Sequence, residues 1–386
     1  MSPRHLASIN DLSLEEIENV FSVAERYLQE LADPSIPYRI ARNTNVCAGS
    51  IMATLFYEPS TRTRLSFESA MLRLGGQVIS SADPAASSAA KGESLADTIR
   101  MASAYADILV LRHPREGAAR FAAAHASVPL INAGDGAHEH PTQTLCDLFT
   151  ILRERHTLND LTVALLGDLK GGRTAHSLAY ALARYGAKLI LMPAPGLELP
   201  EHVASRLGDT FGYEYMKPNE PGGANDRIAG TFVPKGTAPG PVDVVDVLYV
   251  TRFQKERTSK TLTDYPVVNT VTLAADRFKD TLVLHPLPRV RELDPGFDTD
   301  RRAGYFRQAS YGVPVRMALI TTLLKHRGGV APKRGFDGLS AGKICTNINC
   351  ISRDANEPAA TPKLEPSLAD PLRLHCVYCD HEVTAA

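Results

Sequence analysis

Short apolar runs that alternate with helix-like stretches are the feature that most limits the fold of this chain. Candidate buried strands in the first part are Ile51 to Phe56, Ile108 to Leu111 and Val128 to Asn132, and helical periodicity follows each of them. A second series begins at Leu161 with TVALLG and continues to Met192. Strands that alternate with helices predict parallel sheets, in which ligands bind beyond the carboxyl ends of the strands. We therefore expect an α/β protein with two doubly wound parallel-sheet domains.

The stretch YEPSTRTR, residues 57–64, follows the first of these strands and precedes a helix-like segment. Ser60 and Thr61 are good N-cap residues, and the free amides of a helix N-terminus favour negative charge. Arg62 and Arg64 add two guanidinium groups, so the stretch predicts a seat for a phosphate. The plainer alternative is a capped helix with two exposed arginines.

Length and charge limit the possible partners. The chain has 386 residues, enough for two domain cores and a small appendage, and its Lys+Arg count of 42 nearly equals its Asp+Glu count of 43. This balance gives no general attraction to nucleic acid or to a membrane. The N-terminus lacks the apolar core of a signal peptide, and no stretch approaches the roughly 18 apolar residues that span a bilayer. We expect a cytoplasmic protein with no nucleic-acid or membrane partner.

The six cysteines are unevenly spread. Cys47 and Cys146 stand alone in apolar surroundings and are expected to be buried thiols. The last part of the chain holds a C-x₄-C and a C-x₂-C pair, formed by Cys345, Cys350, Cys376 and Cys379. Four thiolates in two close pairs predict a tetrahedral, structural Zn²⁺ site with no open position for catalysis. Unpaired free thiols are the alternative.

The remaining segments predict the limits of the domains. A capping box at Ser13 begins an amphipathic N-terminal helix, and a final packing helix is expected from about Val315 to Leu324. Residues 193–241, rich in Gly and Pro, predict a long surface insertion. We expect a first domain at 1–142 completed by 311–330, a second at 143–310, and a zinc-binding tail at 331–386.

Five motifs in order, FYEPSTRTR, HPTQT, GDLKGGRT, TRFQKER and HPLPRV, resemble the catalytic chain of aspartate carbamoyltransferase from about Ser8 to Arg327. The resemblance implies the transfer of a carbamoyl group from carbamoyl phosphate to L-aspartate, which gives N-carbamoyl-L-aspartate and phosphate. This is the committed step of pyrimidine synthesis. It implies no metal or organic cofactor for the chemistry.

The resemblance also implies the site residues. Carbamoyl phosphate is expected to contact Ser60, Thr61, Arg62, Thr63, Arg112, His140, Gln143, Leu287, Pro288, Ser87 and Lys91. Those expected to act in catalysis are Arg62, Thr63, Lys91, Arg112 and His140. The residues expected to hold aspartate are Lys91, Arg173, Arg252 and Gln254. Because the carbonyl must be polarised, we expect His140 to donate a hydrogen bond to it and not to attack as a nucleophile.

The loop from Ser80 to Lys91 is similar to the family's mobile loop, in which a serine and a lysine reach the active site of a neighbouring subunit. Ser87 and Lys91 are those positions here, so the resemblance implies at least a homotrimer with shared sites. The family often has a second lysine just before Lys91, where this chain has Ala90.

The cysteine-rich tail resembles the zinc domain of the family's regulatory chain, without the nucleotide-binding domain of that chain. The hypothesis is that the tail joins subunits or trimers and that the chain alone does not respond to CTP or ATP. A nucleic-acid-binding zinc ribbon is an alternative, but the basic residues of the tail are scattered.

The main part of the chain has features in common with three other classes of protein. Ornithine carbamoyltransferase shares the S-T-R-T-R loop, but it would need a cysteine in an H-C-L-P motif where this chain has Pro286. An NTPase is suggested by GDLKGGRT, which is spaced like a phosphate-binding loop, but Arg173 stands at the lysine position. A catalytically silent scaffold is disfavoured because every expected catalytic position is occupied.

Overall fold

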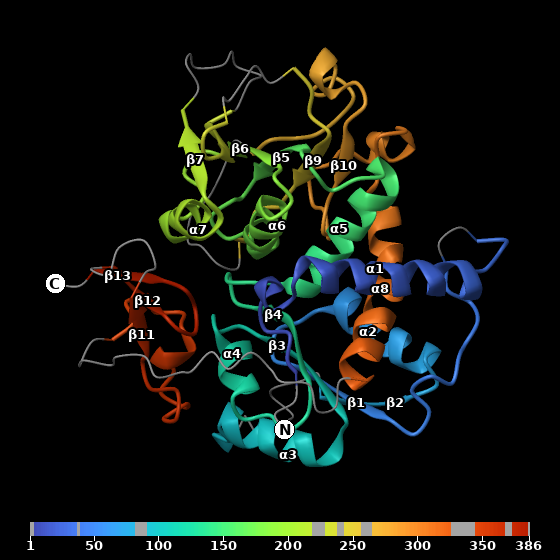
Figure 1. Cartoon of the computed structure of the whole chain (residues 1–386), viewed down its shortest axis with the longest axis vertical. Helices are drawn as coiled ribbons and strands as arrows, with labels where there is room; N and C mark the ends of the chain where they lie inside the picture. The colour runs from blue at the N-terminus through green and yellow to red at the C-terminus, as the bar shows by residue number, and fades with distance from the viewer. Residues whose placement is uncertain are drawn as a thin grey trace. The chain divides into compact units, whose positions relative to one another are not determined.

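The computed structural model describes residues 4–36, 39–81, 91–217, 228–237, 243–255, 265–325, 344–366 and 373–384 (Figure 1). The chain divides into two compact units, which are described separately. The first unit contains residues 1–145 and 311–386, and the second contains Cys146–Ser310. Among the described helices, none is both long and apolar enough to cross a lipid bilayer.

The first unit begins with the predicted amphipathic helix, α1 (Leu14–Leu31). The Ser13 side chain accepts from the Glu16 amide, and Glu16 accepts in return from the Ser13 amide, so the predicted capping box is confirmed. Ile17, Val20 and Phe21 are buried, as the helical spacing required.

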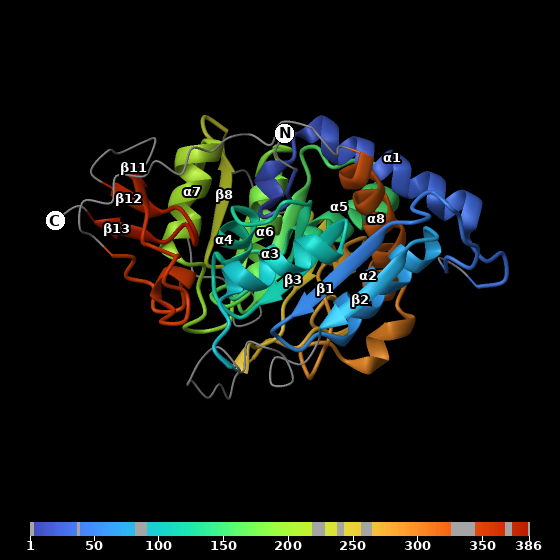
Figure 2. The ribbon, with the colours of Figure 1, turned by 90° about the horizontal axis from the view of Figure 1, so that it is seen from below.

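A four-stranded parallel sheet forms the centre of the first unit, in the order β2-β1-β3-β4. Its elements are β1 (Ile51–Phe56), α2 (Thr61–Arg73), β2 (Gln77–Ser81), α3 (Leu95–Tyr105), β3 (Ile108–His113), α4 (Ala118–Ala123), β4 (Leu130–Asp135) and the start of α5 (Pro141–Arg155). Strands β1, β2 and β3 lie side by side in Figure 2. Because all the strands run in one direction, the loops that follow β1, β3 and β4 leave the same edge of the sheet.

The final helix, α8 (Tyr305–Lys325), begins ten residues earlier than the sequence predicts and contains Pro314. Its part within the first unit is fixed against α2, because Arg316 donates to the Ser66 hydroxyl at 3.0 Å and lies over the Phe67 ring. The return of the chain to the first unit therefore depends on contacts distant in sequence.

The second unit contains a six-stranded sheet in the order β10-β9-β5-β6-β8-β7. Its elements are β5 (Thr162–Gly167), α6 (Arg173–Ala183), β6 (Lys188–Pro193), α7 (Glu201–Phe211), β7 (Tyr213–Met216), β8 (Gly230–Pro234), β9 (Val247–Val250) and β10 (Leu282–Leu284). Strands β10, β9, β5 and β6 are parallel, whereas β8 and β7 add an antiparallel edge.

This edge corrects the expectation that residues 193–241 form a surface insertion. The segment contains α7, β7 and β8, with residues 218–227 and 238–242 outside the described part. Val203 and Leu207 lie one helical turn apart and are both buried, and Phe232 is buried in β8. The frequent Gly and Pro residues obscured these short elements, which are stabilised by packing on the sheet.

The cysteine-rich tail forms a small antiparallel sheet of β11 (Leu364–Pro366), β12 (Arg373–Cys376) and β13 (Glu382–Thr384). It does not form a unit of its own, since its apolar residues share a core with α3 and α4. The ring of Tyr378 packs edge-on against Phe121, with centroids 6.0 Å apart. Gly117, at φ 79°, lies so close to Tyr378 that a Cβ atom would be 2.5 Å from it. The tail is therefore docked on the first unit.

Candidate active site

The predicted phosphate-binding residues lie at one edge of the first unit's sheet. Ser60 is the N-cap of α2 and makes no capping hydrogen bond with its side chain, and Thr61, Arg62 and Thr63 form the first turn of the helix. Arg112 pairs in register with Phe56, the last residue of β1. The structure thus places Arg112 beside the carboxyl end of β1, just before the predicted phosphate-binding residues.

The residues at the carboxyl end of this sheet are called the first half-site, and its arginines differ in their partners. Arg112 donates to Glu58 at 2.9 Å and to the Ala133 carbonyl of β4 at 3.3 Å. Arg64 forms an ion pair along α2 with Glu68 at 3.5 Å, and Arg62 is exposed. The ion pair of Arg64 therefore lies within its own helix.

His140 lies in the loop between β4 and α5, with Gln143 in the first turn of that helix. The imidazole is buried, and its Nδ1 lies 3.4 Å from the Thr142 hydroxyl. Arg112 belongs to β3, and His140 follows the neighbouring strand β4. Lys91 is exposed and lies just before α3, and Ser87 lies outside the described residues.

The second unit brings the predicted aspartate-binding residues to the carboxyl ends of its parallel strands. Arg173 is the first residue of α6 after β5, and it is buried. Arg252 and Gln254 follow β9, the neighbour of β5. Two cationic side chains and an amide at adjacent strand ends are suited to carboxylates.

Asp168, which the sequence analysis did not single out, joins the two loops of this half-site. Its carboxylate accepts hydrogen bonds from the backbone N–H of Gly171 at 2.7 Å and from the backbone N–H of Gln254 at 3.0 Å. The loop amide of Gly171 thus serves an internal carboxylate, which argues against an NTPase that would use this loop to cradle phosphates. Only the tertiary fold brings Gln254 to Asp168, 86 residues earlier.

Tyr265 supports the same junction. Its hydroxyl accepts from the Asp168 amide at 2.6 Å and donates to the Thr251 carbonyl at 2.7 Å. Thr251 in turn donates to the Leu166 carbonyl at 2.9 Å. The ends of β5 and β9 are therefore fastened together beside Arg173 and Arg252. No sequence motif pointed to Tyr265.

Leu287 and Pro288 lie beyond β10, and the peptide bond between them is cis. The Leu287 amide donates to Nδ1 of His285 at 2.8 Å, and Nε2 of His285 lies 2.9 Å from Glu292. Burial lowers the pKa of His285, although Glu292 opposes this effect. A neutral imidazole with its proton on Nε2 satisfies both hydrogen bonds.

The four tail cysteines lie together, as the sequence predicted, and all four are buried. The Cys345 and Cys379 sulfur atoms are 3.6 Å apart, and those of Cys350 and Cys376 are 3.7 Å apart. Four thiolates around a tetrahedral Zn²⁺, each about 2.3 Å from the metal, would be separated by about 3.8 Å. The donor set and its spacing fit such an ion.

Comparisons with known proteins agree with this geometry. Residues 4–153 match the family described as "Aspartate/ornithine carbamoyltransferase, carbamoyl-P binding domain", and residues 233–323 match its "Asp/Orn binding domain". Residues 343–386 match the "Aspartate carbamoyltransferase regulatory chain, metal binding domain". The chain thus combines parts that resemble both a catalytic and a regulatory chain.

The similarity to individual relatives extends over almost the full length of each relative. The aspartate carbamoyltransferase catalytic subunits of Methanothrix thermoacetophila and Thermoplasma acidophilum are 44% and 45% identical over 326 residues, 83% of this chain and 98% of each relative. The catalytic subunit of M. jannaschii aspartate transcarbamoylase superposes with a TM-score of 0.68 at 42% identity, covering 85% of this chain and 100% of that one. The Trypanosoma cruzi enzyme in complex with N-(phosphonacetyl)-L-aspartic acid gives 0.69 at 36% identity, covering 83% and 96%. The described sheets, the two half-sites and these matches together show that the chain belongs to the aspartate carbamoyltransferase family, as a catalytic chain.

Proposed function

We propose that this aspartate carbamoyltransferase condenses carbamoyl phosphate with L-aspartate. Each unit contributes one half-site, which lies at the carboxyl ends of its parallel strands. The observation that carries the proposal is the alignment of β1, β3 and β4, whose carboxyl ends lead to Arg62, Arg112 and His140. The products are N-carbamoyl-L-aspartate and phosphate, in the committed step of pyrimidine synthesis.

The first half-site is proposed to bind carbamoyl phosphate. The α2 N-terminus, with Ser60, Thr61, Arg62 and Thr63, offers amides, hydroxyls and a guanidinium to the phosphate. Each charge-assisted hydrogen bond contributes roughly 1.5–3 kcal/mol, so several together offset the cost of taking a dianion from water. Arg112 bridges the phosphate and the carbonyl, and Gln143 contacts the carbamoyl amino group. On substrate binding, Arg112 exchanges part of its contact with Glu58 for the substrate oxygens.

The second half-site is proposed to bind aspartate. Arg173 and Arg252 hold its two carboxylates, and Gln254 adds a polar contact. The backbone carbonyls of Leu287 and Pro288 face the carbamoyl nitrogen. We assign Asp168 a positioning role, because it fixes the backbone of both loops that carry these side chains.

The reaction then follows from these placements. The uncharged amine of aspartate attacks the carbonyl carbon, a C–N bond forms, and the carbonyl oxygen becomes an oxyanion. His140, Arg112 and Thr63 stabilise that oxyanion as donors, each contributing about 10²- to 10³-fold in rate. The C=O bond re-forms as the C–O bond to phosphate breaks, and phosphate leaves on the cations of the first half-site. The nitrogen passes its proton to the departing phosphate. Holding both substrates in line contributes an effective molarity of about 10⁵ M or more.

Assembly and metal content belong to the same proposal. Ser87 and Lys91 act in the site of a neighbouring subunit, so the active form is a homotrimer. Lys91 carries this role alone, because Ala90 replaces the second lysine. The four clustered cysteines hold one structural Zn²⁺, and the chemistry uses no metal. The three parts proposed are 1–142 with 311–330, 143–310 and 331–386, in a cytoplasmic enzyme without nucleic-acid or membrane partners.

A direct assay tests the reaction. The purified chain is incubated with carbamoyl phosphate and either aspartate or ornithine, and carbamoylated product is measured. We expect turnover with aspartate and inhibition by a bisubstrate mimic that carries a phosphonate and two carboxylates. Preference for ornithine, or no turnover with either amine, would contradict the proposal.

A further inference from the structure

We propose that Asp380 of the docked tail and His138 form a positioning pair that holds His140 in place for catalysis. The pair joins two segments 242 residues apart in sequence. His138 lies two residues before His140, and Asp380 directly follows Cys379 of the cysteine cluster. The inference rests on the catalytic role proposed for His140 and adds a residue of the tail to the machinery that orients it.

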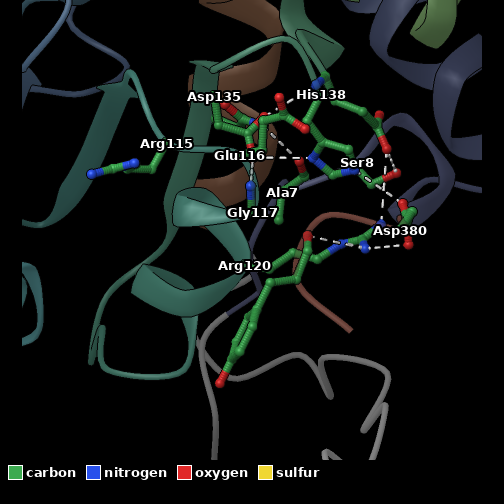
Figure 3. Close-up of polar contacts among 12 residues, drawn as sticks. Ala7, Ser8, Arg115, Glu116, Gly117, Arg120, Asp135, His138 and Asp380 are labelled. Carbon is green, nitrogen blue, oxygen red and sulfur yellow. Dashed lines mark hydrogen bonds and ion pairs between the residues drawn. The ribbon is translucent and has the colours of Figure 1, made fainter. Parts of the chain in front are cut away.

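Figure 3 shows the pair and its neighbours. The His138 ring is buried between two carboxylates: Nδ1 lies 3.1 Å from Asp135, and Nε2 lies 3.0 Å from Asp380. A ring that faces an acceptor at each nitrogen satisfies both only when both nitrogens carry protons. Burial opposes that charge, but the two carboxylates outweigh it and raise the pKa of His138 well above its usual value. The ring is therefore a cationic bridge between the tail and β4.

A second cation completes the network. Arg120 of α4 donates to the other oxygen of Asp380 at 2.6 Å and to the Val377 carbonyl at 3.2 Å. Its guanidinium also lies 3.9 Å from Glu139. Asp380 thus receives one bond from each of two buried cations, and its backbone, at φ 58°, occupies the left-handed region that Asp tolerates better than most residues. The Asp380 carboxylate thus lies between His138 and Arg120.

The loop that carries His138 is fixed on two other sides. Asp135 and Glu139 form an antiparallel bridge, and the Asp135 carboxylate accepts from the Gly117 and Glu139 amides at 2.9 and 3.1 Å. Glu139 is fully buried and accepts from the Ser8 hydroxyl at 2.7 Å. The tail adds a further restraint through Asp380. Since His140 is the next residue after Glu139, a shift of this loop changes the direction of the catalytic imidazole.

A metal site is the alternative interpretation of this cluster. His138, Glu139 and Asp380 each offer a ligand atom within 4.8 Å of the others. However, the Arg120 guanidinium already contacts Asp380 and approaches Glu139, so a divalent cation there would face a buried positive charge at close range. The cluster is therefore an ion-pair network, not a second metal centre.

The test compares two tail carboxylates in the full-length chain. Asp380→Asn removes the negative charge that faces His138 in the proposed pair. Asp354→Asn is the matched control, since Asp354 accepts from Arg115 at 2.9 Å across the same docking surface without contacting the loop of residues 135–140. Both variants are required to keep the metal content of the parent chain. His138→Asn and the His138→Asn/Asp380→Asn double variant complete a mutant cycle.

Asp380→Asn is expected to lower kcat about tenfold, in the range that small misplacement of a catalytic group produces, with little change in KM for aspartate. Amide exchange at residues 136–140 should become about tenfold faster. The double variant should be no slower than His138→Asn, because the pair acts as a unit. Asp380→Glu should restore part of kcat, and Asp354→Asn should leave both kcat and the exchange of this loop unchanged.

The outcomes separate the pair from the proposed function. Unchanged loop exchange in Asp380→Asn, or equal loss of kcat in both tail variants, would overturn the positioning pair even in a fully active enzyme. His140→Ala serves as the separate check of the catalytic role. If His140→Ala keeps full activity, the catalytic role assigned to His140 is wrong, and the claim that the pair serves catalysis is wrong with it. Faster amide exchange in the loop of Asp380→Asn would still show that the tail restrains this loop.

Discussion

The buried imidazole of His285 accepts the backbone N–H of Leu287 at Nδ1, across 2.8 Å, and so fixes the loop beyond β10. Glu292 holds the opposite nitrogen at 2.9 Å, which selects the tautomer that can accept from Leu287. This arrangement orients the Leu287 carbonyl that we propose to contact the carbamoyl nitrogen.

Loss of this imidazole should impair catalysis more than folding. His285→Ala is expected to lower kcat/KM about tenfold or more, because the carbonyl is no longer directed at the substrate. Steady-state kinetics with both substrates measure the effect. Glu154→Gln is the control, since it removes an ion pair with Arg307 at 2.9 Å in the same unit. A His285→Ala enzyme as active as the Glu154→Gln enzyme would refute the role.

Arg173 should be sensitive to replacement by lysine. Arg173→Lys keeps the charge but loses the planar pair of donors, so KM for aspartate should rise about 10- to 100-fold, the equivalent of one charged hydrogen bond. The affinity for carbamoyl phosphate should change little. Arg206→Lys is the matched control, because Arg206 lies over the Tyr180 ring, 4.8 Å from its centroid. A rise in KM for carbamoyl phosphate alone would place Arg173 in the other half-site.

Shared active sites can be detected by mixing inactive variants. Lys91→Ala and Arg62→Ala chains, each nearly inactive, are unfolded together and reassembled. In an equal mixture about a quarter of the sites should combine an intact Arg62 with a neighbour's intact Lys91, and activity should return to that extent. Mixing Lys91→Ala with the double variant is the control and should restore nothing. Stable mixed trimers without activity would show that each site uses its own Lys91.

Acid should destabilise the first unit through His113. Burial lowers the pKa of this histidine to about 4, and its Nδ1 accepts from the Arg115 amide at 3.0 Å. In the unfolded chain a histidine titrates near 6.5, so between about pH 6.5 and 4 the unfolded state binds a proton that the folded state does not. The free energy of unfolding should fall over this range, by on the order of 3 kcal/mol from this residue.

Urea unfolding at several values between pH 7 and pH 4 measures this decrease. His113→Gln should flatten the pH dependence, whereas the same replacement at the exposed His156 should leave it unchanged. A stability that is constant or increases as the pH falls would contradict the assignment of a neutral, buried His113.

The amino-acid sequence determined much of the candidate site because its chemistry is local. The residues of FYEPSTRTR follow a buried strand and begin a helix, so the loop and the helix N-terminus that carry Ser60 to Thr63 could be predicted from neighbours in the chain. The spacing of the four cysteines likewise predicted the cluster that the structure contains. By contrast, weak periodicity in residues 193–241 concealed α7, β7 and β8, which depend on packing against a distant sheet.

The tertiary structure alone decided how these local pieces are held. The bonds from Gln254 to Asp168 and from His138 to Asp380 join residues 86 and 242 positions apart. No periodicity or motif records such pairs, because their stability comes from burial and charge compensation that exist only after the strands have assembled and the tail has docked. Sequence thus specified which groups take part in the chemistry, and the fold specified which distant groups restrain them.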